Sequence, residues 1–374
     1  MYTHNLVRAL ATLPPEERPR TTLFCPRSAD LFKSIEPLVD RLRVYKPLLE
    51  VPPQRKLLYA ARYVKTGITV SLLGEAQPEL AFAARRAHVD SVFAVSNPYT
   101  RLLPNAIAWI PDLQHCALPH LFSALERKSR HHRFTRLLRD SSRHVVFSSN
   151  HALGHAGESY GPVTARTHVM PFATVPEPSW CNDPAPTQAQ YGVPPVYFMN
   201  CNLWAVHKDH ATLIQAVHML ARKGIKVHVV CTGDTWDRRH PDHFAALQEE
   251  IGRLGLESQF QILGLIPRID QVMLIRGASA VVQPSLFEGW STVIEDARAL
   301  GTPVIASDFP VHIEQNAPGS LFFRQGDAED CARAIQEHLV RPETRCHPDG
   351  QHMQRVKAFA RCFVEIVRST VSRN

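Results

Sequence analysis

Short apolar runs alternate with longer amphipathic stretches along the second half of the chain. Each apolar run suits one buried strand, and each amphipathic stretch repeats apolar residues at helical spacing. The predicted strands are 196–200, 226–233, 260–264, 280–285, 303–307 and 320–323, and the predicted helices are 209–224, 242–255, 268–278, one opening at Trp290, and 327–340. This alternation favours an α/β fold with a parallel sheet covered on both faces. Ligands of such sheets bind at the carboxyl ends of the strands, where the strand order switches.

The first half of the chain alternates less regularly. Its predicted strands are 21–25, 68–73, 91–96, 106–110 and 144–149, and its predicted helices are 29–42 and 78–88. The proline-rich stretch 171–195 has little periodicity and is interpreted as an interdomain linker. A chain of 374 residues is too long for one ordinary core. The expected organisation is an N-terminal domain, a C-terminal domain, and an amphipathic helix (354–371) that crosses back to the first domain, with boundaries at 1–178, 179–350 and 351–374.

The composition is that of a soluble globular protein, with 44% hydrophobic and 21% charged residues. No apolar run approaches the roughly 20 residues that span a bilayer. The opening stretch, MYTHNLVRALATLPPEERPR, lacks the features of a signal peptide. Eight cysteines are scattered without paired spacing, which is typical of reduced thiols in the cytosol. A cytoplasmic protein is therefore expected.

Two glutamates flank a turn that opens a helix in the stretch PSLFEGWSTVIEDARALGTPVIASD (284–308). The first N–H groups of this helix, from Ser291, Thr292 and Val293, have no intrahelical partner and form an anion site. A diphosphate bound there would find Glu288 on one side and Glu295 on the other, and carboxylates accept hydrogen bonds from sugar hydroxyls. Gly289 would let backbone approach the ligand closely. The alternative is that both acids only complement the helix dipole.

The same stretch resembles the donor signature of retaining glycosyltransferases of family 4, in the subgroup whose turn reads EGWST. The segment FMNCNLWAVHKDHATLIQAV (198–217) resembles the first strand of that family's C-terminal domain and its phosphate-binding lysine. In the N-terminal half the resemblance rests on IPDLQHCALPHLFS (110–123) and HVVFSSNHALGHAGESYG (144–161). The resemblance implies a GT-B fold, in which two Rossmann-like domains face a central cleft.

The resemblance also implies site residues. Lys208 would offset charge on the leaving diphosphate, Glu295 would bind the ribose hydroxyls and Glu288 would face the transferred sugar. Ile266 would offer backbone groups to the base, or would be a plain core residue, and Gly289 and Trp290 would lie in the turn beside the donor. Asp112 and His115 follow a strand on the acceptor side, where a histidine can bond the sugar or an acceptor hydroxyl.

Three departures from the family pattern stand out. Six residues separate Glu288 from Glu295, where seven are common, and Asn202 and Leu203 stand near the expected position of the lysine's usual arginine partner. The opening MYTHNLVRAL resembles the family's first helix, so the strand and glycine-rich loop that normally precede it are expected to be missing. That loop usually shapes the acceptor side of the site.

No metal and no further cofactor are expected beside the nucleotide-sugar co-substrate. The sequence has no Asp-x-Asp motif, and the Asp- and His-containing loop 233–244 lacks the i, i+4 spacing of a zinc pair.

The run 126–144 is rich in basic residues. Four of them fall within about 120° of one another on a helix: Arg133, Arg136, Arg139 and Arg143. They form either a solvated face or a basic face for anionic lipid head groups at the inner face of a membrane, or for a lipid-diphosphate acceptor. The run lacks interleaved aromatic residues, so no nucleic-acid partner is expected.

The favoured function is a metal-independent retaining glycosyltransferase that uses a nucleotide-diphosphate sugar and a glycan or lipid-linked acceptor. A non-catalytic donor-binding subunit and a GT-B sugar-nucleotide epimerase remain as alternatives.

Overall fold

The computed structural model describes residues 2–26, 32–45, 76–341 and 350–371. The chain divides into two compact units, which are described separately. The first comprises Met1–Leu113, Ala124–Phe172 and Val356–Asn374, and the second comprises Gln114–Ser123 and Ala173–Arg355. No helix in these described ranges is both long and apolar enough to cross a bilayer.

The second unit contains a six-stranded parallel sheet in the order β12-β11-β10-β7-β8-β9. Its strands are β7 (Phe198–Cys201), β8 (Val229–Thr232), β9 (Phe260–Gly264), β10 (Ala280–Gln283), β11 (Val304–Ser307) and β12 (Leu321–Phe323). The strand order reverses at the β7–β10 pair, because β7 leads outward to β8 and β9 while β10 leads outward to β11 and β12. This is the strand order of a dinucleotide-binding fold, with β7–β10 as the switch point.

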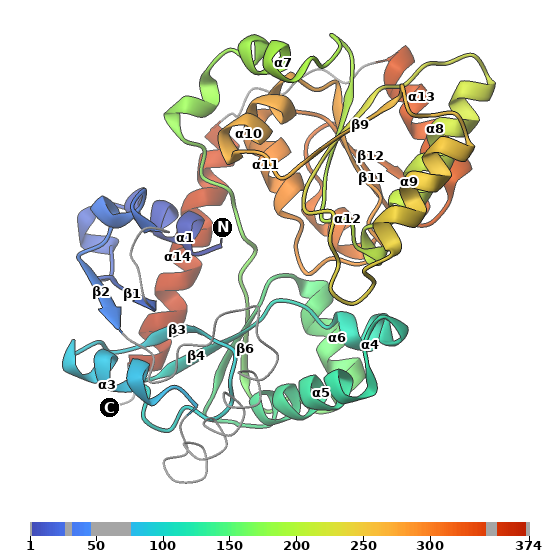
Figure 1. Ribbon diagram of the computed structural model, residues 1–374. Helices are drawn as coiled ribbons and strands as arrows, with labels where there is room; N and C mark the ends of the chain where they lie inside the picture. The colour runs from blue at the N-terminus through green and yellow to red at the C-terminus, as the bar shows by residue number, and fades with distance from the viewer. Residues whose placement is uncertain (1, 27–31, 46–75, 342–349, 372–374) are drawn as a thin grey trace. The chain divides into compact units, whose positions relative to one another are not determined.

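Helices cover both faces of this sheet (Figure 1). They are α7 (Ala185–Tyr191), α8 (His210–Arg222), α9 (His243–Arg253), α10 (Arg268–Gly277), α11 (Thr292–Leu300), α12 (Pro310–Gln315) and α13 (Ala328–Val340). Successive residues of β7 enter opposite cores, since Phe198 packs with residues of α8 and α13 while Met199 packs with residues of α10 and α11. The predicted sheet with both faces buried is therefore confirmed.

The first unit contains two parallel sheets. One pairs β1 (Thr22–Pro26) with β2 (Arg41–Tyr45), and the other has the order β3-β4-β5-β6. The strands of the second sheet are β3 (Val92–Val95), β4 (Ala106–Ile110), β5 (His144–Phe147) and β6 (Arg166–Val169). The helices are α1 (Tyr2–Ala11), α3 (Pro78–Arg86), α5 (Ala124–Leu138), α6 (Asn150–Tyr160) and, from Val356 onward, α14 (Gly350–Val371). Figure 1 shows α1 beside α14, and the Tyr2 and Phe359 rings meet edge to face, with their centroids 5.7 Å apart.

One prediction from the first half is wrong. Over the described part of 29–42 the chain forms a short 3₁₀ turn (Glu36–Leu38) and then enters β2 instead of forming a helix. Pro37 explains the break, because proline removes an N–H donor and clashes within a helix. The stretch 171–195 contains the boundary between the two units, after Phe172, and it also carries α7 and the buried Trp180. The strand predicted at 68–73 lies outside the described residues.

The carboxyl ends of β7 and β8 approach each other at Gly233. This glycine has φ +134°, and a Cβ placed on it would lie 2.1 Å from the carbonyl oxygen of Asn202. We expect Gly233→Ala to destabilise the second unit by at least about 2 kcal/mol, because both the backbone conformation and the close approach must change. Urea denaturation measures this loss. Gly224→Ala is the matched control, because φ is +77° there with open space around the position. Equal losses in the two variants would contradict the close-approach argument.

Candidate active site

Lys208 and Glu288 meet at the switch in strand order of the second unit. Lys208 ends a short 3₁₀ turn (Val206–Lys208) after β7, and Glu288 lies in the turn after β10. The Lys208 Nζ donates to Glu288 Oε1 at 2.6 Å, with side-chain exposures of 16% and 10%. The Leu286 N–H donates to the His207 carbonyl at 2.8 Å and ties the two turns together. Parallel strands place their carboxyl ends at one edge, so residues far apart in sequence form one site.

A buried chain of hydrogen bonds orients Glu288. Gln283 Nε2 donates to Glu288 Oε1 at 2.8 Å, and Ser285 Oγ donates to the same oxygen at 3.0 Å. The Gln283 amide also exchanges two hydrogen bonds with Asn202, at 3.0 and 3.1 Å. Three donors therefore converge on Oε1, while Oε2 accepts no hydrogen bond from the described part of the chain. That second oxygen is the atom available to a ligand hydroxyl.

Glu288 is ionised at neutral pH. Burial alone would raise the pKa of its carboxyl group, but the Lys208 ammonium and His312 outweigh burial and lower the pKa to about 2. The neighbouring His207 is held neutral, since burial and the positive charge of Lys208 lower its pKa to about 4. The ammonium group of Lys208 has three N–H donors and gives one to Glu288, so its other donors can turn to an anion.

Glu295 faces a different set of partners. Its carboxylate is fully buried, and Oε1 accepts from Gln315 Nε2 at 3.1 Å and from Arg355 Nη2 at 3.4 Å. Arg298 lies 3.6 Å from its other oxygen. Burial raises the pKa of Glu295, and the two arginines oppose that rise.

At the start of α11, the Ser291 N–H group that was predicted to bind an anion already has a hydrogen-bond partner. Gln315 Oε1 accepts from the Ser291 N–H at 3.0 Å, and the Ser291 hydroxyl caps the helix by accepting from the Ile294 N–H at 3.4 Å. The Ser291 N–H is therefore not open to an anion, which corrects that part of the predicted set. Thr292 and Val293, the first two helical residues, keep N–H groups without intrahelical acceptors.

Asp296 is a candidate that the sequence interpretation missed. Seven residues separate it from Glu288, which is the common family spacing. Its Oδ1 lies 2.6 Å from Arg268 Nη2 and accepts from the Thr174 hydroxyl at 3.0 Å. Arg268 begins α10, two residues after Ile266, and about a third of its side chain is exposed. Asp296 therefore faces the β9–α10 loop that carries Ile266.

Trp290, His115 and Asp112 are the remaining predicted site residues. Trp290 is half buried and packs with Phe287 and Phe309, so the turn containing Gly289 has an apolar base. His115, in the short helix α4 (Gln114–Ala117), is buried and belongs to the second unit. Asp112 belongs to the first unit, where it pairs with Arg130 at 3.9 Å.

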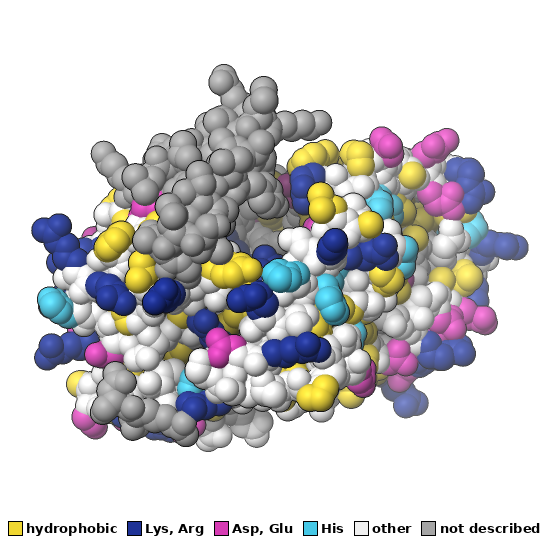
Figure 2. Space-filling view, turned by 90° about the horizontal axis from the view of Figure 1, so that it is seen from below, with side chains coloured by type: hydrophobic (Ala, Val, Ile, Leu, Met, Phe, Trp, Pro, Cys, Tyr) yellow, Lys and Arg dark blue, Asp and Glu magenta, His cyan; other side chains and the backbone are white. Residues whose placement is uncertain are grey.

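The four predicted arginines do not share one face. The helix α5 ends at Leu138, and Arg143 lies in the turn before β5. The Arg143 guanidinium donates to the Thr100 hydroxyl at 2.5 Å and to the Pro98 carbonyl at 3.3 Å, so it points inward. Figure 2 shows basic side chains dispersed over the visible face rather than gathered in one patch. Membrane contact stays a prediction for Arg133, Arg136 and Arg139 alone.

Comparison with solved structures shows the fold class of this protein. A sucrose-phosphate synthase from Thermosynechococcus elongatus is similar over 100% of this chain and 93% of its own, with a TM-score of 0.71 and 18% identity. Anabaena HepE in complex with UDP and glucose is similar over 99% and 94%, with a TM-score of 0.61 and 18% identity. The fold is that of GT-B glycosyltransferases, which have two Rossmann-like domains.

Sequence comparison identifies the second unit more closely. Residues 197–350 match the family model described as Glycosyl transferases group 1. The D-inositol 3-phosphate glycosyltransferase of Corynebacterium glutamicum is 31% identical over 136 residues, which is 35% of this chain and 31% of that protein. The O-antigen chain mannosyltransferase RfbU of Salmonella typhimurium is 32% identical over 95 residues, 25% and 27% of the two chains. The chain thus spans less than a third of the length of these curated relatives.

The low pKa of Glu288 predicts a pH dependence of stability. The folded-state pKa of about 2 lies below the ordinary 4.5, so ionised Glu288 contributes about 3 kcal/mol above pH 4.5. This contribution is lost as pH falls towards 2. We expect the free energy of unfolding of the wild type to exceed that of Glu288→Gln most at neutral pH, and the difference to shrink below pH 4.5. Urea titrations at several pH values measure the difference, and a constant difference would contradict the assignment.

Proposed function

We propose that this protein is a retaining glycosyltransferase that moves a sugar from a nucleotide-diphosphate sugar to a glycan or lipid-linked acceptor, without a metal. The observation that carries the proposal is the Lys208–Glu288 pair at the switch in strand order, inside the part that matches Glycosyl transferases group 1. A cation and an ionised carboxylate there suit a diphosphate and a sugar side by side. Anabaena HepE, which has a similar fold, has been solved with UDP and glucose and with UDP-glucose, which supports a donor of that class.

The proposed reaction exchanges one glycosidic bond for another on the same face of the sugar. The bond between the anomeric carbon and the diphosphate oxygen breaks, and its electron pair stays on the diphosphate. The acceptor hydroxyl oxygen bonds to the anomeric carbon, and the departing diphosphate takes the hydroxyl proton. Lys208 would stabilise the charge that develops on the leaving group, together with the N–H groups of Thr292 and Val293. Glu288 Oε2 would accept a hydrogen bond from a hydroxyl group of the transferred sugar.

For the ribose, we propose Asp296 in place of Glu295. Glu295 already has three partners, the buried Gln315, Arg298 and the partly exposed Arg355, which lie against both oxygens of its carboxylate. Asp296 instead pairs with the partly exposed Arg268, whose side chain can swing aside when a ribose arrives. Ile266 would then meet the base with its backbone groups. His115 keeps its predicted role towards the sugar or an acceptor hydroxyl, and Asp112 keeps its predicted place on the acceptor side.

The overall function is tested with nucleotide sugars. We expect thermal stabilisation by UDP-glucose or another nucleotide sugar, and slow release of the sugar with the same anomeric configuration, followed by NMR in the presence of EDTA. Binding without turnover would favour a non-catalytic subunit, and an altered free nucleotide sugar would favour an epimerase. Activity that EDTA abolishes and magnesium restores would contradict metal independence.

Substitution of Lys208 tests whether this residue contacts the phosphates of the donor. We expect Lys208→Ala to weaken binding of the nucleoside diphosphate by roughly 1.5–3 kcal/mol, the range for charge-assisted hydrogen bonds. The affinity for the corresponding nucleoside should stay unchanged, because Lys208 would contact only phosphate. Calorimetric titration of both ligands provides the measurement. Lys223→Ala, at the exposed end of α8, is the matched control. Equal losses for nucleotide and nucleoside would place Lys208 elsewhere.

Asp296 and Glu295 are distinguished with a ribose analogue. If Asp296 accepts the ribose hydroxyls, the wild type should prefer the ordinary nucleotide over its 2′,3′-dideoxy analogue, and Asp296→Asn should reduce that preference. Glu295→Gln should lower stability and leave the preference intact. Titration of the two nucleotides against the three proteins measures this. If Glu295→Gln reduces the preference and Asp296→Asn leaves it intact, Glu295 is the residue that binds the ribose.

A further inference from the structure

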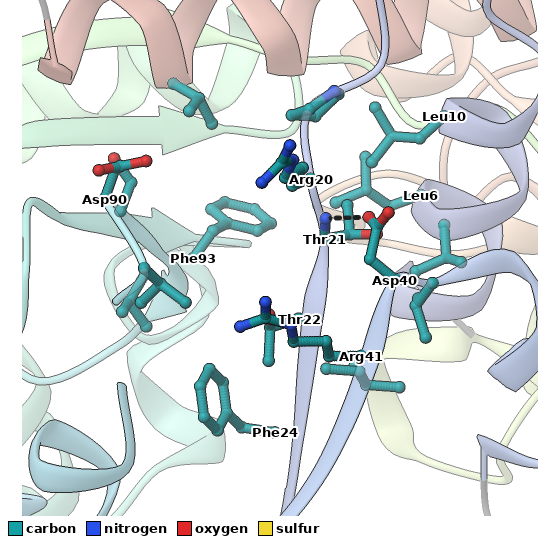
Figure 3. A pocket seen from close by; sticks show the side chains of 18 of the residues that line it. Leu6, Leu10, Arg20, Thr21, Thr22, Phe24, Asp40, Arg41, Asp90 and Phe93 are labelled. Atoms are coloured by element: carbon teal, nitrogen blue, oxygen red, sulfur yellow. Dashed lines mark hydrogen bonds between the residues drawn. The ribbon is translucent and has the colours of Figure 1, made fainter. Parts of the chain in front are cut away.

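Two cavities of the first unit differ in the charges that line them. The larger, of about 950 Å³, is lined by two arginines and two aspartates, whose charges balance: Arg20, Arg41, Asp40 and Asp90 (Figure 3). The smaller, of about 360 Å³, is lined by Arg143 and Arg166 and by no carboxylate of the described chain. A cavity whose lining charges have one sign attracts ions of the opposite sign. The smaller cavity, called the basic cavity below, is therefore a candidate anion site.

The basic cavity lies at the amino ends of three parallel strands. Ala106 begins β4, His144 begins β5 and Arg166 begins β6, and all three residues line the cavity. Nucleotides and other substrates of such sheets bind at the opposite edge, beside the carboxyl ends of the strands. The predicted acceptor-side residue Asp112 follows the carboxyl end of β4. The basic cavity is thus a second site, apart from the predicted acceptor edge of the same sheet.

Arg143 contributes a fixed positive charge to the wall of the basic cavity. Its guanidinium donates to the Thr100 hydroxyl at 2.5 Å and to the Pro98 carbonyl at 3.3 Å. It also lies 3.5 Å from Asp140, which compensates part of its charge. These contacts occupy most of the donors of Arg143, so this side chain holds the wall in place and adds charge to it.

Arg166 has N–H donors available for a ligand. The residue is half buried, and its guanidinium donates through Nη1 to His144 Nε2 at 3.3 Å. Within the described ranges it makes no other side-chain hydrogen bond and no ion pair with a carboxylate. A guanidinium carries five N–H donors in a planar fork, so most of those of Arg166 remain available. A partly buried cation without a counter-charge costs free energy, and a bound anion would offset this cost.

Two histidines fix the position of the Arg166 guanidinium. Arg166 and His144 are register partners in the parallel pair β5–β6. Because a guanidinium only donates, His144 Nε2 accepts, and the ring proton of His144 lies on Nδ1, which donates to His168 Nε2 at 2.9 Å. Burial lowers the pKa of His168, so its ring stays a neutral acceptor at neutral pH. This chain of hydrogen bonds holds Arg166 at the cavity and leaves its charge uncompensated.

We propose that the basic cavity binds a phosphate group through Arg166. The fork of a guanidinium matches two oxygens of a phosphate group, and the charge of Arg143 strengthens the attraction. The Thr100 hydroxyl and the second N–H of the Asn105 amide lie in the same lining and can donate to further oxygens. The volume is near the lower end of the range of ligand sites, about 300–1,000 Å³, so the cavity suits a phosphate group with a small substituent.

Inorganic phosphate is the probe, and calorimetric titration at constant ionic strength, with chloride as the balancing anion, is the measurement. The titrations are made in the wild type and in Lys208→Ala, because phosphate could also bind at the candidate donor site. We expect Lys208→Ala to keep a site for phosphate, and Arg166→Gln added to Lys208→Ala to lower the affinity of that site at least tenfold. Arg166→Lys keeps the charge but loses the fork, so it should lower the affinity about fivefold.

The matched control is Arg101→Gln, since Arg101 is exposed and follows Thr100 in the chain but does not line the cavity. Its affinity for phosphate should equal that of the parent protein. Hydrogen exchange locates the site, because phosphate bound to Arg166 should slow exchange at the starts of β5 and β6 and leave β8 of the other unit unchanged.

Vesicles distinguish the two sources of a phosphate group. Phosphatidic acid presents a phosphomonoester at a membrane surface, and phosphatidylcholine vesicles are the neutral reference. Sedimentation with phosphatidic acid that Arg166→Gln abolishes would assign the cavity to a lipid head group. Binding of inorganic phosphate without sedimentation would assign it to a soluble phosphate.

The proposal is overturned if folded Lys208→Ala binds no phosphate at millimolar concentrations, or if Arg166→Gln leaves the affinity unchanged. Arg166 would then only complement the carbonyl end of α14, where Thr370 lines the cavity. If circular dichroism shows that Arg166→Gln does not fold, Arg166→Lys decides the question, and an unchanged affinity in that variant overturns the proposal.

Discussion

The pairing of β7 with β10 is the constraint on which the candidate active site depends. It brings together two turns that lie 80 residues apart in sequence, and the Lys208–Glu288 bond closes between them. The Asn202–Gln283 amide pair connects the ends of the same two strands. It fixes the orientation of the Gln283 amide, which in turn donates a hydrogen bond to Glu288. Ligands of such sheets bind beside the switch in strand order, so the hydrogen bonds of these two strands fix the charged pair at the position where a ligand is expected.

Three carboxylates lie near one helix start, and their surroundings give them different properties. Glu288 is buried beside a lysine, which keeps it ionised far below its ordinary pKa. Burial raises the pKa of both Glu295 and Asp296, and nearby arginines oppose that rise. A raised pKa stabilises the folded state at low pH and loses that contribution as pH increases, so these two oppose Glu288. Only Glu288 combines a low pKa with an oxygen that no described residue occupies.

Apolar periodicity predicted the second unit well because its four inner strands are buried along their whole length and its longer helices each bury one face. It could not show which polar side chains meet, so Gln283 and Arg268 were missed. A polar residue in the apolar run AVVQ and the seven-residue spacing to Asp296 were the available signals. The first unit was less predictable. Pro37 lies in a segment whose apolar spacing suggested a helix but which forms a 3₁₀ turn, and the inward hydrogen bonds of Arg143 depend on tertiary partners that no helical spacing reveals.

The two units contribute differently to the candidate site. The second unit has one parallel sheet, and every group assigned to the donor, including Lys208, Glu288 and Asp296, comes from it. The predicted acceptor-side residue Asp112 belongs to the first unit. The charges that would hold a diphosphate are therefore set within one unit, by the pairing of β7 with β10 and by the turns that follow these two strands.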